Sequence, residues 1–285
     1  MIRLSAFSDE AGNSLQEQIA ALKRNGISFM EIRNVDGVNV QKLTLEQAEA
    51  IQAELEKNGL SVWSVGSPMG KVKLTEEFCF EEYLNDVRHL CKLANIFKTD
   101  KIRMFSFLQA YDKPEQVVAY LNRMVEVAAE YGVVLYHENE KKVYGDTVER
   151  VLELMDAVKG LKFVYDPANY LQCGEPSAKT LAALHHKTDY FHIKDVIFET
   201  GELVPAGYGD GAIEELVSMI KDDKVMTIEP HLAVFEGYAT IDDEKMKNKF
   251  HFASNSEAFD AAVNAIKEVL KKVGYIEQNG GYVKV

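Results

Sequence analysis

Two hydrophobic patterns alternate along the chain, and each predicts one kind of secondary structure. Segments whose apolar residues recur three and four positions apart predict amphipathic helices, whereas short apolar runs between turn residues predict buried strands. We expect strands at 2–7, 27–33, 60–66, 101–107, 133–138, 161–166, 189–194 and 225–229. We expect helices at 14–25, 44–58, 76–95, 113–131, 147–158, 177–186, 212–221 and 257–273.

Capping residues mark several of these boundaries independently of the hydrophobic pattern. Ser14 with Glu17, and Thr44 with Gln47, have the spacing of a capping box at a helix start. Gly26 follows the first expected helix, where the left-handed turn that ends many helices suits glycine. Helix, glycine and apolar strand therefore recur in that order.

Eight strands that alternate with eight helices indicate a helix-covered parallel sheet, and eight such units close a (β/α)8 TIM barrel. A doubly wound open sheet is the alternative, but no GxGxxG motif follows the first strand. The 285 residues contain no linker-like or low-complexity tract, so we expect one TIM-barrel domain over 1–285. The segment from about 231 to 256 is long for a loop, and we expect a lid or an oligomer contact there.

Composition and charge narrow the range of partners. The formal net charge of −13 disfavours nucleic acid, because its binding depends largely on Lys and Arg at the phosphates. The N-terminal residues lack a signal-peptide pattern, and no run reaches the about 18 apolar residues of a membrane span. We therefore expect a cytoplasmic protein without membrane contact, and the three cysteines form no CxxC pair.

The last four expected strands each end in a residue that can bind a metal ion: Glu138, Asp166, His192 and Glu229. The carboxyl ends of barrel strands open on one face, so these side chains should meet there. One such residue alone is usually a hydrogen-bonding residue at a loop start, but four on successive strands favour a site. Three carboxylates and one imidazole are unstable together without a cation. This donor set suits Mn²⁺, Mg²⁺, Co²⁺ or Zn²⁺, so we expect one divalent ion.

Strand parity tests this assignment. If Glu138 points into the barrel, Tyr136 does too, whereas His137 faces the helices. Glu140 has the same parity as Glu138, so the pattern leaves open which of the two binds. Arg103 points inward only if Phe105 does as well, which the pattern also leaves open.

Several short motifs resemble those of a known superfamily. They are EN at 138–139, YDPAN at 165–169, HIKD at 192–195, PAGYGD at 205–210 and IEPH at 228–231. In this order they resemble the xylose isomerase-like barrels, which include sugar isomerases, ketose 3-epimerases, inosose dehydratases and the endonuclease IV group. The resemblance implies that Glu138, Asp166, His192 and Glu229 bind one metal ion, with manganese preferred.

The resemblance also implies chemistry. In the isomerase and epimerase branches, the residues that match Glu138 and Glu229 move protons while the metal holds vicinal oxygens of a sugar. A Lewis acid beside a carbonyl favours proton removal through an enediolate, and two carboxylates can take and return the proton. The alternatives are an inosose- or dehydroshikimate-type dehydratase with the same metal site, and a non-catalytic sugar-binding barrel.

Two departures leave the exact substrate open. Asn169 stands where the endonuclease and 3-epimerase branches have histidine, and Phe198 stands where the 3-epimerases have arginine. A phosphorylated substrate would need more basic residues than Lys71 and Lys194, so an unphosphorylated ketose or related polyol ketone is expected. Lys194 can instead form a salt bridge to Asp195 or Glu229. The expected substrate contacts are Asn169, Lys194, His231 and Lys71.

Overall fold

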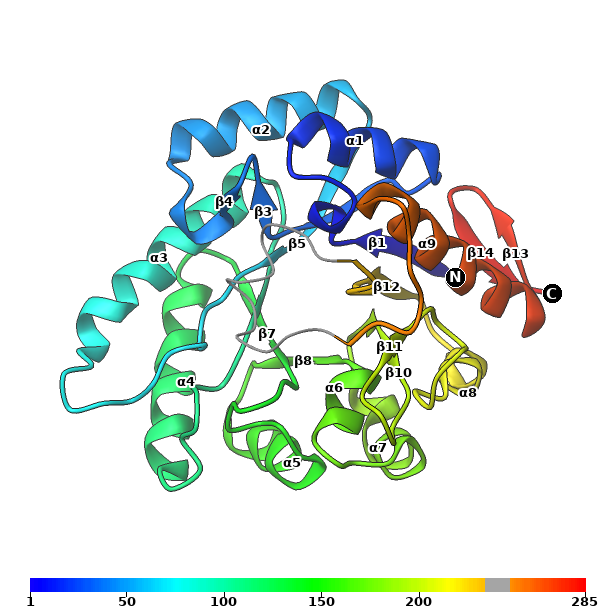
Figure 1. Ribbon diagram of the computed structural model, residues 1–285. Helices are drawn as coiled ribbons and strands as arrows, with labels where there is room; N and C mark the ends of the chain where they lie inside the picture. Colours follow the sequence, from blue (N-terminus) through cyan, green and yellow to red (C-terminus); the bar gives the residue numbers. More distant parts are fainter. Residues whose placement is uncertain (234–246) are drawn as a thin grey trace.

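A computed structural model describes residues 1–233 and 247–285, and its centre is a closed barrel of eight parallel strands (Figure 1). Each strand pairs in parallel with the next, and the last pairs with the first. The strands are β1 Ile2–Ala6, β2 Phe29–Ile32, β5 Ser61–Gly66, β6 Lys101–Met104, β7 Val134–Glu138, β8 Lys162–Tyr165, β9 Tyr190–Ile193 and β12 Lys224–Ile228. The predicted TIM barrel and all eight of its predicted strands are confirmed.

Helices surround the barrel, and the eight predicted ones are present. They are α1 Leu15–Arg24, α2 Leu45–Lys57, α3 Phe80–Ile96, α4 Pro114–Ala129, α5 Val148–Ala157, α7 Ser177–Leu184, α8 Ile213–Met219 and α9 Asn255–Lys272. Both predicted capping boxes are formed, at the starts of α1 and α2. The start predicted at residue 76 for α3 is wrong, because Phe78 donates its backbone N–H to Thr75 in a turn that precedes the helix.

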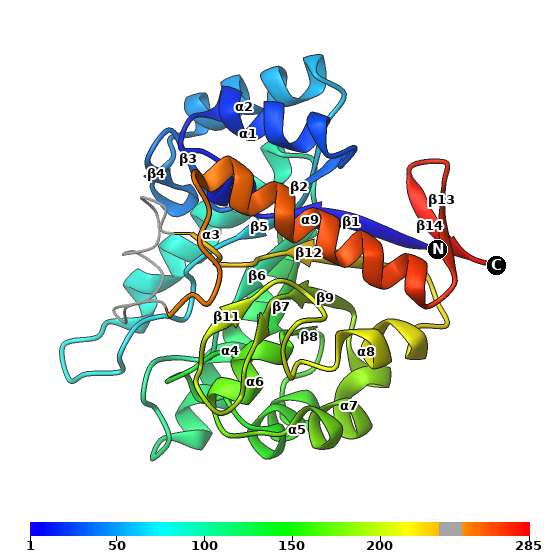
Figure 2. The same ribbon diagram turned by 45° about the vertical axis from the view of Figure 1, so that its right-hand side comes forward.

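Several short elements were not predicted. Helix α6 (Pro167–Gln172) begins directly after β8, and the 3-10 helices are η1 Ser8–Glu10, η2 Val40–Lys42 and η3 His185–Lys187. Two hairpins lie in loops, β3 Asn34–Val35 with β4 Val38–Asn39, and β10 Asp195–Val196 with β11 Leu203–Val204. A terminal hairpin of β13 (Tyr275–Gln278) and β14 (Gly281–Lys284) pairs antiparallel with β1 beside the N-terminus (Figure 2).

The barrel interior is filled in layers, as the strand parity predicted. Tyr136, Tyr190 and Trp63 pack together in a lower apolar layer, with ring centroids 5.5 Å (Tyr136–Tyr190) and 5.9 Å (Trp63–Tyr190) apart. His137 lies on the other face of β7, where its Nε2 is 2.9 Å from the hydroxyl of Ser106. The side chain that follows at position 138 therefore points into the barrel above the apolar layer.

The loops after β5, β6 and β7 are tied together at the mouth of the barrel. Leu108 forms isolated β-bridges to Lys73 on one side and Val143 on the other. Phe105 donates its backbone N–H to the carbonyl of Met69 over 2.8 Å. Because backbone hydrogen bonds hold these loops to each other, side chains that they carry have a defined position at the mouth.

Residues 234–246, which form the middle of the predicted lid at 231–256, lie outside the described residues. The lid and the oligomer contact both stay predictions. Among the described helices, none combines the length and the apolar character needed to cross a membrane.

Gly70 and Gly132 provide a matched test of how tightly the mouth is packed. Both have positive φ, but an added Cβ would lie 2.1 Å from the Phe105 carbonyl oxygen at Gly70 and would meet no atom within 4 Å at Gly132. We expect Gly132→Ala to lower the free energy of unfolding by about 1 to 2 kcal/mol, the cost of the left-handed conformation. Gly70→Ala should lose about 1 to 3 kcal/mol more through overpacking. Equal losses in urea unfolding would contradict the packing seen here.

Candidate metal centre

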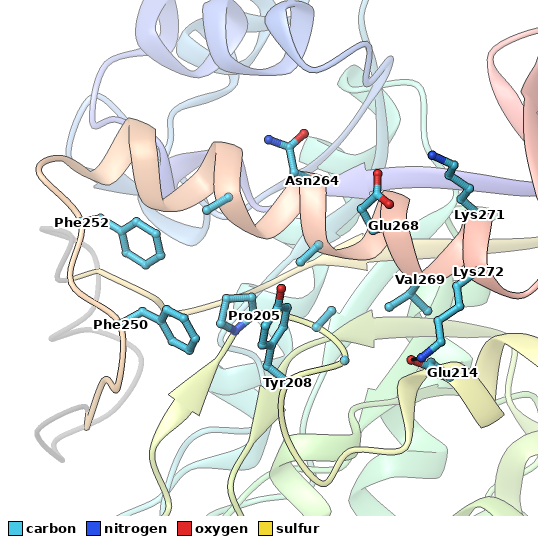
Figure 3. A pocket seen from close by; sticks show the side chains of 14 residues that line it. Pro205, Tyr208, Glu214, Phe250, Phe252, Asn264, Glu268, Val269, Lys271 and Lys272 are labelled. Atoms are coloured by element: carbon cyan, nitrogen blue, oxygen red, sulfur yellow. Dashed lines mark hydrogen bonds and ion pairs between the residues drawn. The ribbon is translucent and has the colours of Figure 1, made fainter.

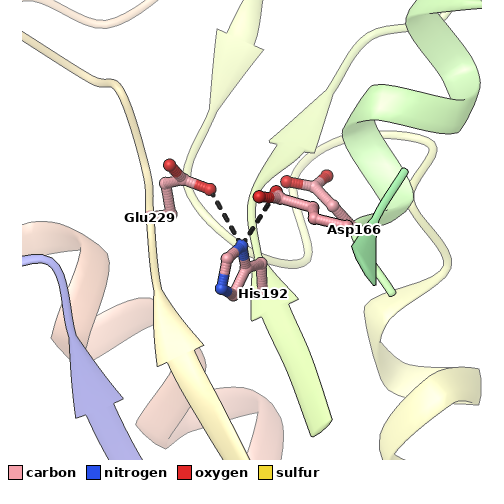
Figure 4. A group of neighbouring side chains, drawn as sticks. Asp166, His192 and Glu229 are labelled. Carbon is pink, nitrogen blue, oxygen red and sulfur yellow. Dashed lines mark hydrogen bonds and ion pairs between the residues drawn. The ribbon is translucent and has the colours of Figure 1, made fainter. Parts of the chain in front are cut away.

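The four predicted metal ligands come together inside the mouth of the barrel. Glu138 ends β7, Asp166 follows β8, His192 lies in β9 and Glu229 follows β12. Each offers one ligand atom, and these four atoms all lie within 4.8 Å of one another. All four side chains are buried, and Figure 4 shows His192 between strands that present Asp166 and Glu229. The structure thus supplies the predicted geometry, while the role of each residue stays a prediction.

The two nitrogens of His192 face different partners. Nδ1 lies 2.9 Å from Glu138 Oε1. It also lies 3.2 Å from Glu229 Oε2 (Figure 4), so it points into the cluster. Nε2 lies 3.2 Å from Oε2 of Glu31, a buried carboxylate on β2. A metal-binding histidine commonly donates its other ring N–H to a carboxylate, which orients the ring. Nδ1 is therefore the candidate ligand atom.

Glu31 is a site residue that the sequence analysis missed. Its Oε2 also accepts a hydrogen bond of 2.8 Å from Thr227, and its Oε1 accepts one of 3.0 Å from Tyr190. Burial disfavours its charged form, but His192 outweighs this and holds the Glu31 pKa below its usual value. The available signal was a carboxylate of inward parity within the apolar strand 27–33.

Electrostatics show how much this cluster needs positive charge. Burial opposes the imidazolium form of His192, but carboxylates beside it, foremost Glu138, hold its pKa well above the usual value. Burial raises the pKa of Asp166 to about 7, although Lys194 opposes that shift. Burial also opposes ionisation of Glu229, yet Lys194 and His192 hold the Glu229 pKa well below its usual range. The ammonium of Lys194 and the imidazolium of His192 supply positive charge to this cluster. A divalent ion can provide that positive charge instead.

Lys194 belongs to the cluster itself. Its Nζ lies 2.8 Å from Asp166 Oδ2 and 3.8 Å from Glu229 Oε2. The alternative salt bridge to Asp195 is wrong, because both oxygens of Asp195 accept backbone N–H groups instead. Three of those donors are Gly207, Gly209 and Gly211, so Asp195 holds the loop after β11 in shape. Lys194 is left pointing at the predicted ligands.

The choice between Glu138 and Glu140 is a matter of geometry. Glu140 stands outside the four-residue cluster, and its Oε2 lies 2.9 Å from Nζ of Lys71. Glu138 faces His192 with one oxygen, and its other oxygen lies 3.1 Å from Nε of Arg103. The geometry therefore favours Glu138 as the ligand. In the same contacts, Lys71 lies at the mouth of the barrel and Arg103 points into the barrel.

Asn169 is buried beside the cluster, at the start of α6. Its backbone N–H donates to Asp166 Oδ1 over 2.9 Å, which makes Asp166 the N-cap of this helix. Its side-chain amide donates to the carbonyl of Asn139 over 3.0 Å and to Glu138 Oε1 over 3.4 Å. This predicted substrate contact thus orients two of the candidate ligands as well.

A second group of charges lies on the far side of Glu229. His231 Nε2 is 3.3 Å from Glu10 Oε1 and 3.6 Å from Glu229 Oε1. Arg33 Nη1 donates to Glu229 Oε1 over 2.8 Å, while its Nε and Nη2 donate to Asp9 over 2.9 Å each. Arg33 and the two acids of η1 were missed. Their contact depends on strands that meet only when the barrel closes.

The four ligand atoms fit a divalent cation by their chemistry and their surroundings. Asp166 Oδ2 and Glu229 Oε2 are buried and accept no hydrogen bond from the described residues, so only ionic contacts balance them. Buried carboxylate oxygens in this state are costly without a cation. Carboxylate oxygens with a single imidazole are also the donor set that manganese, magnesium or zinc accepts.

A larger groove than the small cavity beside Arg33 and Arg103 lies elsewhere. It holds about 870 Å³ between α9 and the loop after β11 (Figure 3). Its walls are mostly apolar and include Tyr208, Phe250, Phe252 and Val269. None of the four candidate ligands lines it. Size alone therefore does not identify the site, and the convergent titratable groups at the barrel mouth do.

Comparisons with known proteins agree with the fold. The protein-family model described as "Xylose isomerase-like TIM barrel" matches residues 19–269 of this chain. A search of curated protein sequences gives no match. Among solved structures, the probable 3-DHS dehydratase AsbF from Bacillus anthracis is 17% identical with a TM-score of 0.72, and 94% of this chain and 99% of that chain are covered.

Two further solved structures have the same fold. The IolI protein with a bound zinc atom is 15% identical with a TM-score of 0.71, covering 95% of this chain and 99% of its own. An L-ribulose 3-epimerase is 15% identical with a TM-score of 0.69, covering 96% of each chain. A probable dehydratase, an epimerase and a protein with a bound zinc atom thus have this architecture.

Removing a predicted ligand should remove the metal without unfolding the barrel. We expect Asp166→Ala and His192→Ala to lose a stoichiometric divalent ion, because the site lies above an already packed apolar layer. Metal content after gel filtration, measured beside circular dichroism, checks both parts. Full occupancy in both variants would remove these residues from the ligand set.

Glu31 should act on the metal through His192. We expect Glu31→Gln to weaken metal affinity by about 10- to 100-fold, as is typical for the partner of a ligating histidine. Chelator competition measures the affinity, and Glu46→Gln on the exposed side of α2 is the control. An unchanged affinity in Glu31→Gln would show that the contact with Nε2 does not orient the ligand.

Proposed function

The chain belongs to the xylose isomerase-like TIM barrel family, and we propose that it is a metal-dependent sugar isomerase or epimerase. One observation supports this proposal above the others. Glu138 and Glu229 approach Nδ1 of His192 from separate strands, with contacts of 2.9 Å and 3.2 Å. Their remaining oxygens are paired with Arg103 and Arg33, respectively. Two oriented carboxylates that flank a candidate metal are what proton transfer on a bound ketone requires.

Each residue has a definite part in this chemistry. Glu138, Asp166, His192 and Glu229 would hold a divalent ion, for which manganese is our preferred choice. When bound, such an ion polarises a substrate carbonyl and acidifies the neighbouring C–H. One glutamate accepts that proton and the other returns a proton to the adjacent carbon or to the opposite face. Lys194, 2.8 Å from Asp166, is placed to stabilise the negative charge that develops on the substrate oxygen.

The substrate class follows from the same site. An unphosphorylated ketose or related polyol ketone offers a carbonyl and a neighbouring hydroxyl that can share one cation. Asn169 and His231 lie beside Glu138 and Glu229 and can donate hydrogen bonds to hydroxyl groups.

A dehydratase is the second candidate, and Glu10 favours it. Burial, opposed by Arg33, raises the pKa of Glu10 to about 8, which favours the protonated form of its carboxyl group at neutral pH. It lies 3.3 Å from His231 at the edge of the cluster. A neutral acid in that position can protonate a departing hydroxyl after the first proton has been removed. Isomerisation and elimination share that first step.

Solvent exchange distinguishes these functions. The metal-loaded protein is incubated in D₂O with a panel of ketoses and inososes, and deuterium uptake and enone absorbance are followed together. Deuterium uptake without loss of water supports an isomerase or epimerase. A growing enone absorbance supports the dehydratase. Tight binding with neither deuterium uptake nor any product supports a non-catalytic sugar-binding barrel.

The two glutamates should be needed for turnover beyond their part in metal binding. We expect Glu138→Gln and Glu229→Gln, compared at equal metal occupancy, to lose about 10²- to 10⁴-fold in kcat. Glu140→Gln keeps the ligand set intact and should lose far less. A metal-loaded Glu229→Gln protein with near-normal turnover would exclude Glu229 as an acid or base. If only Glu140→Gln were inactive, the ligand on β7 would have to be reassigned.

A further inference from the structure

We propose that each carboxylate of the metal cluster can offer a cation only one of its two oxygens, and that the site therefore rejects Ca²⁺ in favour of smaller divalent ions. This proposal rests on the proposed function through its ligand set alone. The residues that bind the remaining oxygens set the metal preference, and they are Arg103, Arg33 and the first turn of α6.

One oxygen of each carboxylate faces the other members of the cluster. Glu229 Oε2 lies 3.2 Å from His192 Nδ1 (Figure 4). Glu138 Oε1 lies 2.9 Å from the same nitrogen. Asp166 Oδ2 lies 2.8 Å from Nζ of Lys194. Asp166 Oδ2 and Glu229 Oε2 accept no hydrogen bond from the described residues, so these inward oxygens are the ones open to a cation.

Two buried arginines bind the other oxygens of the glutamates. Glu138 Oε2 lies 3.1 Å from Nε of Arg103. Glu229 Oε1 accepts a hydrogen bond of 2.8 Å from Nη1 of Arg33. Arg103 is fixed in addition by the carbonyl of Ser67, to which its Nη1 donates over 2.9 Å. A cation at the second oxygen would meet a fixed positive charge beside it, so both glutamates are restricted to one oxygen.

Asp166 is restricted by the helix that follows it. Its Oδ1 accepts the backbone N–H of Asn169 over 2.9 Å, as the N-cap of α6. The side chain of Asn139 accepts the backbone N–H of Asp166 and donates to the Asp166 carbonyl, over 2.9 Å each. Asn169 closes the ring, because its side chain donates to the carbonyl of Asn139 over 3.0 Å. This buried ring leaves Oδ2 as the oxygen of Asp166 that points into the cluster.

One oxygen from each carboxylate suits small divalent ions and disfavours Ca²⁺. With His192, the four residues then supply one ligand atom each. Mn²⁺ and Mg²⁺ take about six ligands in an octahedron, so about two oxygens of substrate or water complete the shell. Ca²⁺ takes about 6 to 8 oxygens at longer distances and often binds both oxygens of a carboxylate. A rigid site whose second oxygens are occupied cannot provide these.

The ratio of the Ca²⁺ and Mn²⁺ dissociation constants tests this proposal. Metal-stripped protein is titrated with each ion alone, and we expect wild type to bind Mn²⁺ about 100-fold tighter or more. Arg103→Met frees Glu138 Oε2, so Ca²⁺ should gain about 10-fold or more relative to Mn²⁺. Lys101→Met on the same strand is the control, because the Lys101 ammonium lies over the ring of Trp63 in the lower apolar layer. It also removes one positive charge, but it should leave the ratio unchanged.

Asn139→Ala tests the restriction of Asp166 without a change of charge. Loss of the ring lets Asp166 turn both oxygens to the ion, so Ca²⁺ should again gain about 10-fold relative to Mn²⁺. Asn122→Ala is the control, because the Asn122 amide also makes two backbone hydrogen bonds, to Val118 and Ala157, but on α4. Circular dichroism and urea unfolding show which variants are folded and can be compared.

The outcomes separate this proposal from the proposed function. A wild-type protein that binds Ca²⁺ within about 10-fold of Mn²⁺ would overturn the selectivity whether or not the variants fold. Ratios that change equally in a variant and its control would overturn it as well, while deuterium uptake into a ketose would still support the enzyme. Selective Mn²⁺ binding that depends on Arg103 and Asn139, without deuterium uptake, would support the selectivity and overturn the isomerase. Stoichiometric binding of neither ion to wild type would overturn both.

Discussion

Buried negative charge is the constraint around which the mouth of this barrel is arranged. Glu138, Asp166 and Glu229 meet within a few ångströms, in a place with almost no access to water. Carboxylates so placed are stable only when cations compensate them, because the protein interior solvates charge poorly. His192 and Lys194 provide part of that compensation, and a divalent ion at the same atoms would provide it more completely.

The barrel tolerates the buried carboxylates because they are separated from its apolar core. The layer of Trp63, Tyr136 and Tyr190 fills the interior beneath the cluster. Alternation along each strand then turns the next inward positions to the mouth, where polar side chains meet. The candidate ligands and the core residues thus lie in different layers of the same strands. A substitution at a candidate ligand can therefore change the site without disrupting the core.

Acids and cations alternate around the mouth, so the buried charges are compensated locally. Arg33 lies among Asp9, Glu10 and Glu229. Lys71 pairs with Glu140, and Arg103 faces Glu138. Because each of these cations has a carboxylate partner, the network of ion pairs holds the side chains around the candidate ligands in place.

Local sequence patterns determined the elements of this protein, and with them the strand ends that carry Glu138, Asp166, His192 and Glu229. Period and capping act over a few residues, which is why the eight strands and the capping boxes of α1 and α2 were predictable. The additional elements α6 and the β13–β14 hairpin were missed, since Asp166 caps α6 and β14 needs β1 as a neighbour. Only the closed barrel brought Glu31 to His192 and Arg33 to Glu229, and only the mouth loops separated Glu138 from Glu140. These contacts join residues far apart in sequence, so no local periodicity contains them, and they arise from the direction in which each strand points its side chains once the sheet has closed.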